Sequence, residues 1–552
     1  MKKGLLALGA LFAICLSMLA TDMVVKQDNG KDRKINVVDT SETFLRFKIL
    51  SDSTVELTKE SSYRGYDPFT TLEYCGHNSI TIPEKVRIGR KVYTVTSIGI
   101  AAFYRCDNLI SISIPEGVTS IGVAAFEECI NLTSINMPER LTSIGVAAFE
   151  GCRSLTNIDI PESLTNIGEN AFSGCYSLEN ISIPEGVTSI GEFAFSGCSS
   201  LKSINIPESV TSIGASTFYG CSSLEPKLLV YDKGTKCYGW VGNKEKCTNV
   251  VIPDGVTSIG YAAFRGCGSL TSIKIPEGVT SIGNSAFRSC DNLTNVNIPE
   301  GVTSIGEDVF SGCYSLENIS IPEGVTSIEK FAFRGCGSLT SIDIPESLTS
   351  IGVAAFEGCR SLTSIDIPES LTSIGEDAFG DCNSLNPKLL VYDKGTKCYG
   401  WLGNKGKCID VVIPKGVTSI GGSAFQGCHS LTNINVPESV TSIGKDVFWG
   451  CHSLENISIP EGVTSIGNKA FYACSSLTSI NIPESVSSIG DWAFRLCNSL
   501  TSINIPESVT SIGKDAFWGC SNLEIVIDNS KKKVEVGWNA FENCKSVTWL
   551  KE

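Results

Sequence analysis

The chain has 552 residues and a formal net charge of −15 at pH 7, and 42% of its residues are hydrophobic while 19% are charged. This composition excludes disordered and collagen-like chains, which have fewer apolar residues or a glycine at every third position. The acidic balance disfavours nucleic acids and anionic membranes as partners, since the longest basic run is only Lys531-Lys532-Lys533.

The first 20 residues have the pattern of an export signal. Lys2 and Lys3 precede an uncharged apolar run that ends at Ala20, and a polar segment follows. We expect residues 1–20 to be a signal peptide cleaved after Ala20, with an uncleaved anchor or a lipoprotein linked through Cys15 as alternatives. No second apolar stretch of about 20 residues follows, so no transmembrane span is expected in the mature chain. The protein is therefore predicted to be secreted or held at the cell surface.

Residues 21–98 precede the regular part of the sequence and are predicted to form an N-terminal cap. Ile80 to Pro83 has the pattern of a first, degenerate strand. Nine extra residues near Val86 to Val95 predict a hairpin around a glycine. A solenoid needs such a cap because its first rung would otherwise expose an apolar face.

A repeat of 23 residues occupies residues 99–522 and is marked by cysteines at constant spacing. Its cysteines form three series: Cys106, Cys129, Cys152, Cys175, Cys198 and Cys221; Cys267, Cys290, Cys313, Cys336, Cys359 and Cys382; and Cys428, Cys451, Cys474, Cys497 and Cys520. The two gaps between series are both 46 residues, so the frame is maintained throughout. Cys544 is one residue out of step.

The unit that begins at Cys152, CRSLTNIDIPESLTNIGENAFSG, indicates what each repeat builds. Its apolar residues are Leu155, Ile158, Ile160, Leu164, Ile167, Ala171 and Phe172. The first three follow the strand pattern of leucine-rich repeats, and Pro161 ends that strand. A second short extended segment follows, and the spacing of the last apolar residues predicts a single helical turn. The sequence therefore predicts a leucine-rich-repeat solenoid of short parallel β-strands with single helical turns, about twenty rungs of 23 residues in one curved rod.

Two segments replace one rung each by a variant loop, at residues 225–253 and 386–414. Both contain KLLVYDKGTKCYGW, and they lie 161 residues, or seven units, apart. Val250 and Ile252 still fit the strand frame, so the solenoid is expected to continue through the loops. Residues 523–552 are predicted to cap the C-terminal end.

The repeat sequence SIPEGVTSIGEFAFSGCSSLKSI and the CYGW loops resemble the BspA-type leucine-rich repeats over about residues 75–552. Members of that family are surface or secreted proteins of oral and gut anaerobes, with counterparts in parasitic protists, and some adhere to host matrix proteins or to other bacteria. The resemblance implies an adhesin-like protein whose partners are host extracellular-matrix or surface proteins, glycans or other bacteria. It supplies no functional residues. Ser163 stands where the general motif has an asparagine, and no C-terminal sorting motif is visible.

The polar residues recur as columns instead of converging on one pocket, so no enzyme activity and no cofactor are expected. Asp343 and Asp366 could be taken for an acid–base pair, but they belong to a strand position that carries Ser, Asn or Asp throughout. His429 and His452 lie one repeat apart and are interpreted as a solvated pair and not as a metal site.

The column of 18 cysteines is unusual for an exported chain. Buried thiols are expected, because parallel side chains in adjacent rungs hold their Cβ atoms about 4.8 Å apart, beyond the roughly 3.5–4.5 Å of a disulfide. Disulfides between adjacent rungs are the alternative. Within the variant loops, Cys237 with Cys247 and Cys398 with Cys408 are candidate disulfide pairs, because nine residues with a Gly-Trp turn could close a hairpin between them.

The positions that vary most are the two after the glycine, the one after Ala-Phe and the one after the cysteine. Toward the C-terminus they carry the candidate ligand-contact residues Trp449, Tyr472, Trp492, Trp518, His429 and His452. Aromatic side chains outside a core commonly anchor protein or glycan contacts. Covering of the solenoid's outer edge is the alternative interpretation. We therefore predict an exported adhesin-like binding protein, with a structural or antigenic surface-coat protein without a specific ligand as the alternative.

Overall fold

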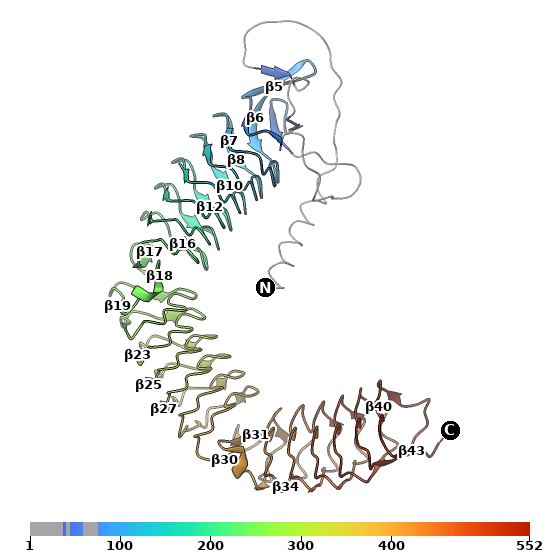
Figure 1. The fold of residues 1–552 in the computed structure, drawn as a ribbon. Coiled ribbons are helices and arrows are strands. Elements are labelled where there is room, and N and C mark those ends of the chain that lie inside the picture. The colour runs from blue at the N-terminus through green and yellow to red at the C-terminus, as the bar shows by residue number, and fades with distance from the viewer. Residues whose placement is uncertain (1–36, 40–44, 59–75, 552) are drawn as a thin grey trace. The chain divides into compact units, whose positions relative to one another are not determined.

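The computed structural model describes residues 37–39, 45–58 and 76–551 (Figure 1). The predicted signal peptide at residues 1–20 lies outside these residues. The described chain divides into two compact units, and the boundary lies in the variant loop at residues 225–253. Within each unit, short parallel strands recur every 23 residues, and the predicted leucine-rich-repeat solenoid of about 20 rungs is confirmed.

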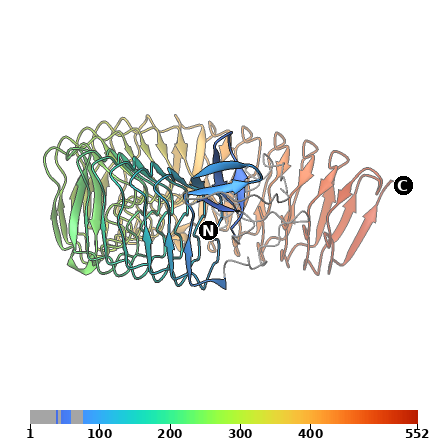
Figure 2. The ribbon, with the colours of Figure 1, turned by 90° about the horizontal axis from the view of Figure 1, so that it is seen from above.

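Most rungs contribute two short strands, and within a unit most strands pair in parallel with their equivalents in the adjacent rung. Figure 2 shows successive rungs as closely spaced coils. Isoleucine pairs with isoleucine, as Ile319 does with Ile342, because a shift of 23 residues brings an equivalent residue to each strand position. In most three-residue strands the central isoleucine or valine is buried and both neighbours are exposed, as β-strand alternation requires. The sequence period therefore sets the register directly.

The strands of the first unit form two columns. The first column is β4 (Ser79–Thr81), β7 (Ser111–Ser113), β9 (Ser134–Asn136), β11 (Asn157–Ile158), β13 (Asn180–Ser182) and β15 (Ser203–Asn205). The second column is β6 (Lys91–Ile98), β8 (Ser120–Ile121), β10 (Ser143–Ile144), β12 (Asn166–Ile167), β14 (Ser189–Ile190) and β16 (Ser212–Ile213).

The second unit, described by itself, also has two columns of strands. The first column is β19 (Asn249–Val251), β21 (Ser272–Lys274), β23 (Asn295–Asn297), β25 (Asn318–Ser320), β27 (Ser341–Asp343), β32 (Asp410–Val412), β34 (Asn433–Asn435), β35 (Asn456–Ile457), β37 (Ser479–Ile480), β39 (Ser502–Ile505), β41 (Glu524–Ile527) and β43 (Ser546–Trp549). The second column is β20 (Ser258–Ile259), β22 (Ser281–Ile282), β24 (Ser304–Ile305), β26 (Ser327–Ile328), β28 (Ser350–Ile351), β29 (Ser373–Ile374), β33 (Ser419–Ile420), β36 (Ser465–Ile466), β38 (Ser488–Ile489), β40 (Ser511–Ile512) and β42 (Glu535–Val536).

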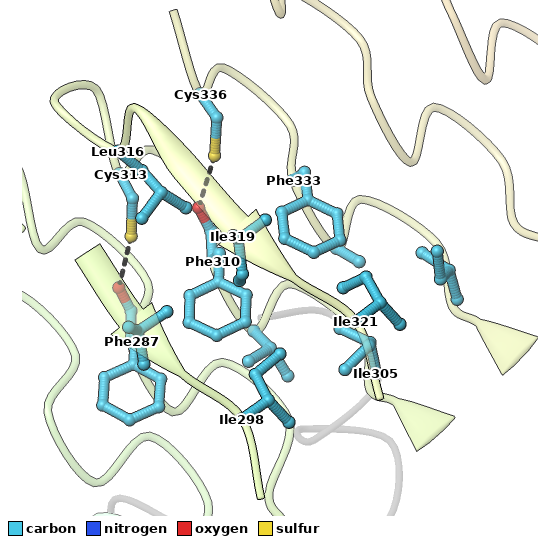
Figure 3. Packing of buried hydrophobic residues seen from close by; sticks show 14 of the residues in the cluster. Phe287, Ile298, Ile305, Phe310, Cys313, Leu316, Ile319, Ile321, Phe333 and Cys336 are labelled. Atoms are coloured by element: carbon cyan, nitrogen blue, oxygen red, sulfur yellow. Dashed lines mark hydrogen bonds between the residues drawn. The ribbon is translucent and has the colours of Figure 1, made fainter. Parts of the chain in front are cut away.

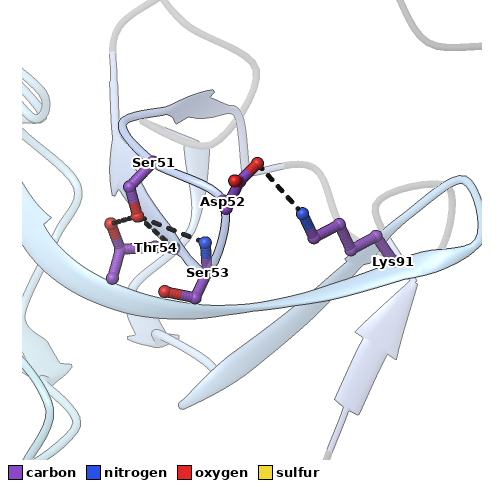
Figure 4. A network of polar contacts seen from close by, with 5 residues as sticks. All are labelled: Ser51, Asp52, Ser53, Thr54 and Lys91. Carbon is purple, nitrogen blue, oxygen red and sulfur yellow. Dashed lines mark hydrogen bonds and ion pairs between the residues drawn. The ribbon is translucent and has the colours of Figure 1, made fainter.

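Before the first regular rung, a small set of strands covers the end of the stack. These strands are β1 (Val37–Asp39), β2 (Phe47–Ile49), β3 (Thr54–Leu57) and β5 (Lys85–Ile88), with the first half of β6. β5 and β6 form an antiparallel hairpin that turns at Gly89, whose φ of +64° favours glycine. The β2–β3 turn is joined to this hairpin by the ion pair of Lys91 with Asp52 at 3.2 Å (Figure 4).

The core is a set of columns in which identical side chains stack on each other. The ring centroids of Phe287, Phe310 and Phe333 lie 5.4 Å apart in succession, and all three rings are fully buried (Figure 3). The thiols of Cys313 and Cys336 donate to the carbonyl oxygens of Phe287 and Phe310 at 3.1 and 3.2 Å. Each cysteine thus satisfies a carbonyl of the preceding rung, and the cysteine column is part of the core.

The segment around Ala-Phe is not helical, contrary to the predicted helical turn. In the rung of Phe310, the N–H groups of Asp308, Phe310 and Gly312 donate to carbonyl oxygens of the next rung at 3.1, 2.8 and 2.7 Å. Asp308 and Gly312 have φ values of +58° and +74°. These left-handed residues turn the chain while leaving alternate N–H groups free for the next rung, so the segment is a series of turns.

The thiols that donate to a phenylalanine carbonyl should be shielded from reagents. Burial raises the pKa of Cys313 to about 12, which keeps its reactive thiolate scarce at neutral pH. Thiol counting on protein without reductant should therefore give few reactive groups in the native state and many after denaturation. Few thiols in the denatured protein would show instead that the column is oxidised. Cys106 is excluded from this expectation, because it is disulfide-bonded.

The glycine that follows the second strand has no room for a side chain. A Cβ on Gly467 would lie 2.5 Å from the carbonyl carbon of Gly444 and 2.7 Å from the nitrogen of Lys445. Gly467→Ala should therefore force adjacent rungs apart and lower the free energy of unfolding by about 1–3 kcal/mol. The measurement is the melting temperature from circular dichroism.

A matched control lies in the same rung at Gly462, where a Cβ would lie 3.6 Å from the nearest atom. Later rungs carry serine here, and Ser508 donates to the carbonyl of Val486 at 2.7 Å. Gly462→Ser should leave the melting temperature unchanged or raise it. Equal losses in Gly467→Ala and Gly462→Ser would contradict the close-approach argument.

The second variant loop, at residues 386–414, is built into the stack of its unit. It contains a hairpin of β30 (Lys388–Tyr392) and β31 (Lys397–Leu402), followed by the 3-10 helix η3 (Lys405–Lys407). The first loop has the same elements: β17 (Lys227–Tyr231), β18 (Lys236–Val241) and η2 (Lys244–Lys246). On the side before the second loop, Asn386 N–H donates to the Thr363 carbonyl at 3.0 Å, and on the other side β31 pairs with β33. The 23-residue stacking therefore passes through this loop.

Residues 523–552, predicted as a C-terminal cap, continue the rung pattern with β41, β42 and β43. β41 pairs in parallel with β39, and β43 pairs with β41. Phe541 and Cys544 take the phenylalanine and cysteine positions of the last rung but are only half-buried, because no further rung covers them.

Candidate functional site

The outer turn of each rung, between the glycine and the next cysteine, presents the side chains that vary along the chain. Alanine and phenylalanine of this turn point into the core, so the first two positions and the one after phenylalanine are left for the surface. In the last five rungs these positions hold aromatic and cationic side chains in contact with each other. We call this set the aromatic–cation ladder: Trp449, Lys469, Tyr472, Trp492, Arg495, Lys514, Trp518 and Trp538.

The ladder begins with Trp449 and Tyr472, one rung apart. Their ring centroids lie 5.7 Å apart in an edge-to-face arrangement. The ammonium of Lys469 lies 4.9 Å from the centroid of Trp449 and 5.5 Å from that of Trp492. One cation therefore bridges two tryptophans on different rungs.

The same arrangement repeats further along the chain. The ammonium of Lys514 lies 5.6 Å from the centroid of Trp492 and 5.2 Å from that of Trp538. Trp449, Lys469, Trp492, Lys514 and Trp538 thus alternate ring and cation across five rungs. Such contacts each contribute roughly 0.5–1 kcal/mol at exposed sites, so together they fix the orientation of the rings.

A second branch of the ladder is anchored by Asp515, which is buried. Its carboxylate accepts a hydrogen bond from the indole N–H of Trp492 at 3.0 Å and lies 3.6 Å from the guanidinium of Arg495. The guanidinium carbon of Arg495 lies 4.2 Å from the ring centroid of Trp518. Asp515 therefore orients an indole and, through Arg495, a second indole.

The structure brings four of the six predicted contact residues into one surface. Trp449, Tyr472, Trp492 and Trp518 are half-buried and lie outside the phenylalanine core, as the outer-turn pattern predicts. His429 and His452 are exposed, and each uses Nδ1 in a hydrogen bond to a backbone carbonyl, at 3.0 and 2.9 Å. No group of three or more metal-ligating side chains is found within the described residues.

Trp538 and the three cations were missed in the sequence. Trp538 occupies one of the variable positions, directly after Gly537, and is 71% exposed. It was overlooked because residues 523–552 were assigned to a cap. Lys469, Arg495 and Lys514 occupy the same variable positions, but only the geometry shows that they lie over the rings.

The strand face offers a different, more uniform surface. A shallow hollow of about 360 Å³ lies over β23, β25 and β27, and Asn297, Ser320 and Asp343 are among its lining residues. A second hollow of about 450 Å³ lies beside the second variant loop and is lined mainly by polar groups such as Asn386 and Asn404. Both hollows are lined by small polar side chains, and the one over β23, β25 and β27 also by Val296 and Ile319.

The variant-loop cysteines Cys237, Cys247, Cys398 and Cys408 are thiols in the structure, and the two members of each predicted pair lie at different places in the rung. In the second loop, Cys398 pairs with Ile420 in the second strand column, whereas Cys408 lies two residues before β32. The buried Leu402 occupies the phenylalanine position between them. The two cysteines of each loop therefore belong to different core columns.

The outer turns of the first unit carry several carboxylates, among them Glu127 and Glu150. Burial, reinforced by the neighbouring charges of Glu150 and Glu128, raises the pKa of Glu127 to about 7. The folded state therefore holds this proton more tightly than the unfolded chain, and stability should fall as the pH rises from about 4.5 to about 7. Glu127→Gln should weaken this dependence and raise the melting temperature at pH 8. Glu116→Gln, at an exposed carboxylate, is the control, and an equal effect of both changes would refute the burial argument.

The chain is similar to several bacterial proteins. A leucine rich cell surface protein of Faecalibacterium prausnitzii is 31% identical, with 60% of this chain and 93% of that chain covered and a TM-score of 0.43. A leucine-rich repeat protein from Bacteroides ovatus is 26% identical, with 92% and 98% covered and a TM-score of 0.34. The pneumococcal vaccine antigen PcpA is 18% identical, with 81% and 91% covered and a TM-score of 0.40.

No curated protein matches the chain. Within the described residues, no helix has both the length and the apolar character needed to cross a membrane. The family model of the BspA type leucine rich repeat region matches six copies, over residues 96–225, 242–336, 303–390 and 402–524. These matches cover most of the rungs described above, and the chain therefore belongs to the family of BspA-type leucine-rich repeat proteins.

Proposed function

We propose that this protein is an exported or cell-surface binding protein, adhesin-like, that contacts a host or bacterial surface macromolecule through the aromatic–cation ladder. The observation that carries the proposal is the ladder itself. Four tryptophans and a tyrosine occupy outer turns of consecutive rungs, outside a core that is already complete without them. Large aromatic side chains in such positions are the usual anchors of macromolecular contacts. The proposal assigns no catalysis and no cofactor.

The geometry of the ladder suits binding because its side chains are already ordered. Trp492 is fixed by Asp515 and by two lysines, and Trp518 by Arg495. Ordered rings lose little conformational freedom when a partner covers them, so more of the contact energy becomes affinity. The cations beside the rings can pair with acidic groups of the partner while the rings stack on its apolar or sugar faces.

The test is a binding screen of purified residues 21–552 against matrix proteins, mucins and glycans. We expect saturable binding to one of these classes of ligand. Variants of the ladder should lose this binding, and variants of the strand face should keep it. Capture that does not saturate with any ligand would refute the proposal and favour the second candidate function.

That second candidate is a structural or antigenic surface-coat protein. It is favoured by the uniformity of the rungs, in which the same phenylalanine, cysteine and isoleucine columns continue irrespective of what the outer turns carry. A coat protein needs only this regular stacking. It would show no dependence of its surface role on Trp449 or Trp518.

A further inference from the structure

Near its C-terminal end, each variant loop has a cysteine at the position where the regular rungs have a core leucine. β32 pairs in register with β34, and extending this register by two residues sets Cys408 beside Leu431. The first loop repeats the arrangement with Cys247 and Leu270. Both cysteines are fully buried. A thiol therefore stands at a position where the regular rungs have a leucine side chain.

The column cysteine that follows each loop lacks the usual acceptor for its thiol. Cys451 and Cys474, further along the column, donate to phenylalanine carbonyls at 3.2 Å. Cys428 and Cys267 come directly after a loop rung that contains no phenylalanine, and no such bond is formed by either within the described chain. Their sulfurs are therefore available to another partner.

The partner is the cysteine of the loop. The side chain of Cys408 hydrogen-bonds that of Cys428, and the side chain of Cys247 hydrogen-bonds that of Cys267. The bond from Cys408 lowers the pKa of the Cys428 thiol, against the rise that burial causes, and the charge of Lys405 lowers it further. Cys428 is therefore the sulfur of its pair that ionises first.

We propose that Cys408 with Cys428, and Cys247 with Cys267, are the disulfide-forming pairs of the two variant loops, and that each bond staples its loop to the following rung. The members of each pair are 20 residues apart in sequence. The same placement occurs at both loops, although they lie 161 residues apart. Column cysteines such as Cys497 and Cys520 also contact each other, but both donate to phenylalanine carbonyls, so we expect them to remain thiols.

The oxidation needs an external disulfide, from a small molecule or from a thiol–disulfide oxidoreductase. The thiolate of Cys428 attacks one sulfur of that disulfide and forms a mixed disulfide, and the other sulfur leaves as a thiol after taking up a proton. Cys408 then loses its proton and attacks the Cys428 sulfur, which releases the second external sulfur as a thiol. Two electrons thus pass from the pair to the external disulfide. Because both cysteines are buried in the native chain, we expect the reaction late in folding, when Cys408 already lies beside Cys428 but the pair is not yet covered.

The pairing can be read directly from tryptic peptides. Residues 21–552 are reduced, unfolded and refolded in reduced and oxidised glutathione until the native circular dichroism spectrum returns, and free thiols are then alkylated under denaturing conditions. Trypsin separates the cysteines of the second loop onto peptides 398–405, 408–415 and 416–445, and those of the first onto peptides 237–244, 247–265 and 266–274. We expect peptide 408–415 linked to 416–445 and peptide 247–265 linked to 266–274, with the loss of four thiols beyond those of the Cys106 disulfide. A link between peptides 398–405 and 408–415, or no link in natively refolded protein, would overturn the proposal.

A matched variant tests what the bonds do. Cys408→Leu restores the leucine of the regular rung, so it should fold as well as the reduced native sequence. Oxidation should raise the melting temperature of the native sequence more than that of the double variant Cys247→Leu with Cys408→Leu, which retains the Cys106 disulfide. An equal rise in both proteins would show that the stabilisation comes from other cysteines, and the staple would be rejected.

Discussion

Replacing Trp449 and Trp518 together by alanine should weaken binding of the captured ligand at least about tenfold and leave the fold intact. Truncation of an interface anchor typically costs about 2 kcal/mol or more, whereas neutral contact residues cost less than about 1. Both indoles lie outside the core, against Lys469, Tyr472 and Arg495, so their loss uncovers no core column. The measurement is the dissociation constant for the ligand found in the screen, together with the melting temperature.

The control for this prediction lies on the strand face. Asn481 and Asn504 flank buried isoleucines and are exposed, so Asn481→Ala with Asn504→Ala removes polar surface without altering the core. This pair should cost less than about 1 kcal/mol of binding. If the asparagine pair abolishes binding and the tryptophan pair does not, the strand face is the binding surface. If the tryptophan pair unfolds the protein, the ladder is a structural cover and not a binding surface.

Replacing Phe310 by alanine should lower the free energy of unfolding by about 3–5 kcal/mol, the usual cost of removing a buried aromatic ring. The ring is fully buried and stacks on two neighbours at 5.4 Å, so its loss leaves a cavity that neither neighbour can fill without leaving its own rung. The measurement is chemical denaturation followed by circular dichroism.

An aromatic residue in the same rung provides the control. Tyr314 is 60% exposed, and Tyr314→Ala should change the free energy of unfolding by less than about 0.5 kcal/mol. Similar losses for Phe310→Ala and Tyr314→Ala would mean that the stacked rings do not dominate stability. The comparison separates burial from aromatic character, since both substitutions remove one ring.

The sequence predicted which side chains face the core because the same apolar positions recur in nearly every 23-residue unit. In the unit of Cys152, Leu155, Ile158, Ile167 and Phe172 are 0–4% exposed, as the pattern requires. The same spacing could not distinguish a helical turn from a series of turns, since both place Ala171 and Phe172 on one side. The two arrangements differ in backbone conformation, since Asn170 has a φ of +54° in the structure. An asparagine in the sequence does not by itself reveal this conformation, because asparagine is also common in ordinary turns.

The cysteine pairs of the loops show a second limit of the sequence. Nine intervening residues favoured Cys398 as the partner of Cys408, because short loops close easily. The structure places Cys408 in the leucine column and Cys398 in the isoleucine column, so closeness in sequence does not become closeness of the thiols. Cation–ring contacts such as that of Arg495 with Trp518 were equally invisible, because they join residues of different rungs through side-chain orientation.

The division between inner columns and outer turns has a consequence for how the protein can change in length. Away from the variant loops, successive rungs present the same carbonyl, thiol and ring to their neighbours. Deleting or duplicating a whole 23-residue unit would therefore rejoin matching surfaces and shift everything beyond it by one rung, about 4.8 Å. The spacing between the outer surfaces that different rungs carry can thus vary in fixed steps, while the chemistry that closes the core stays the same.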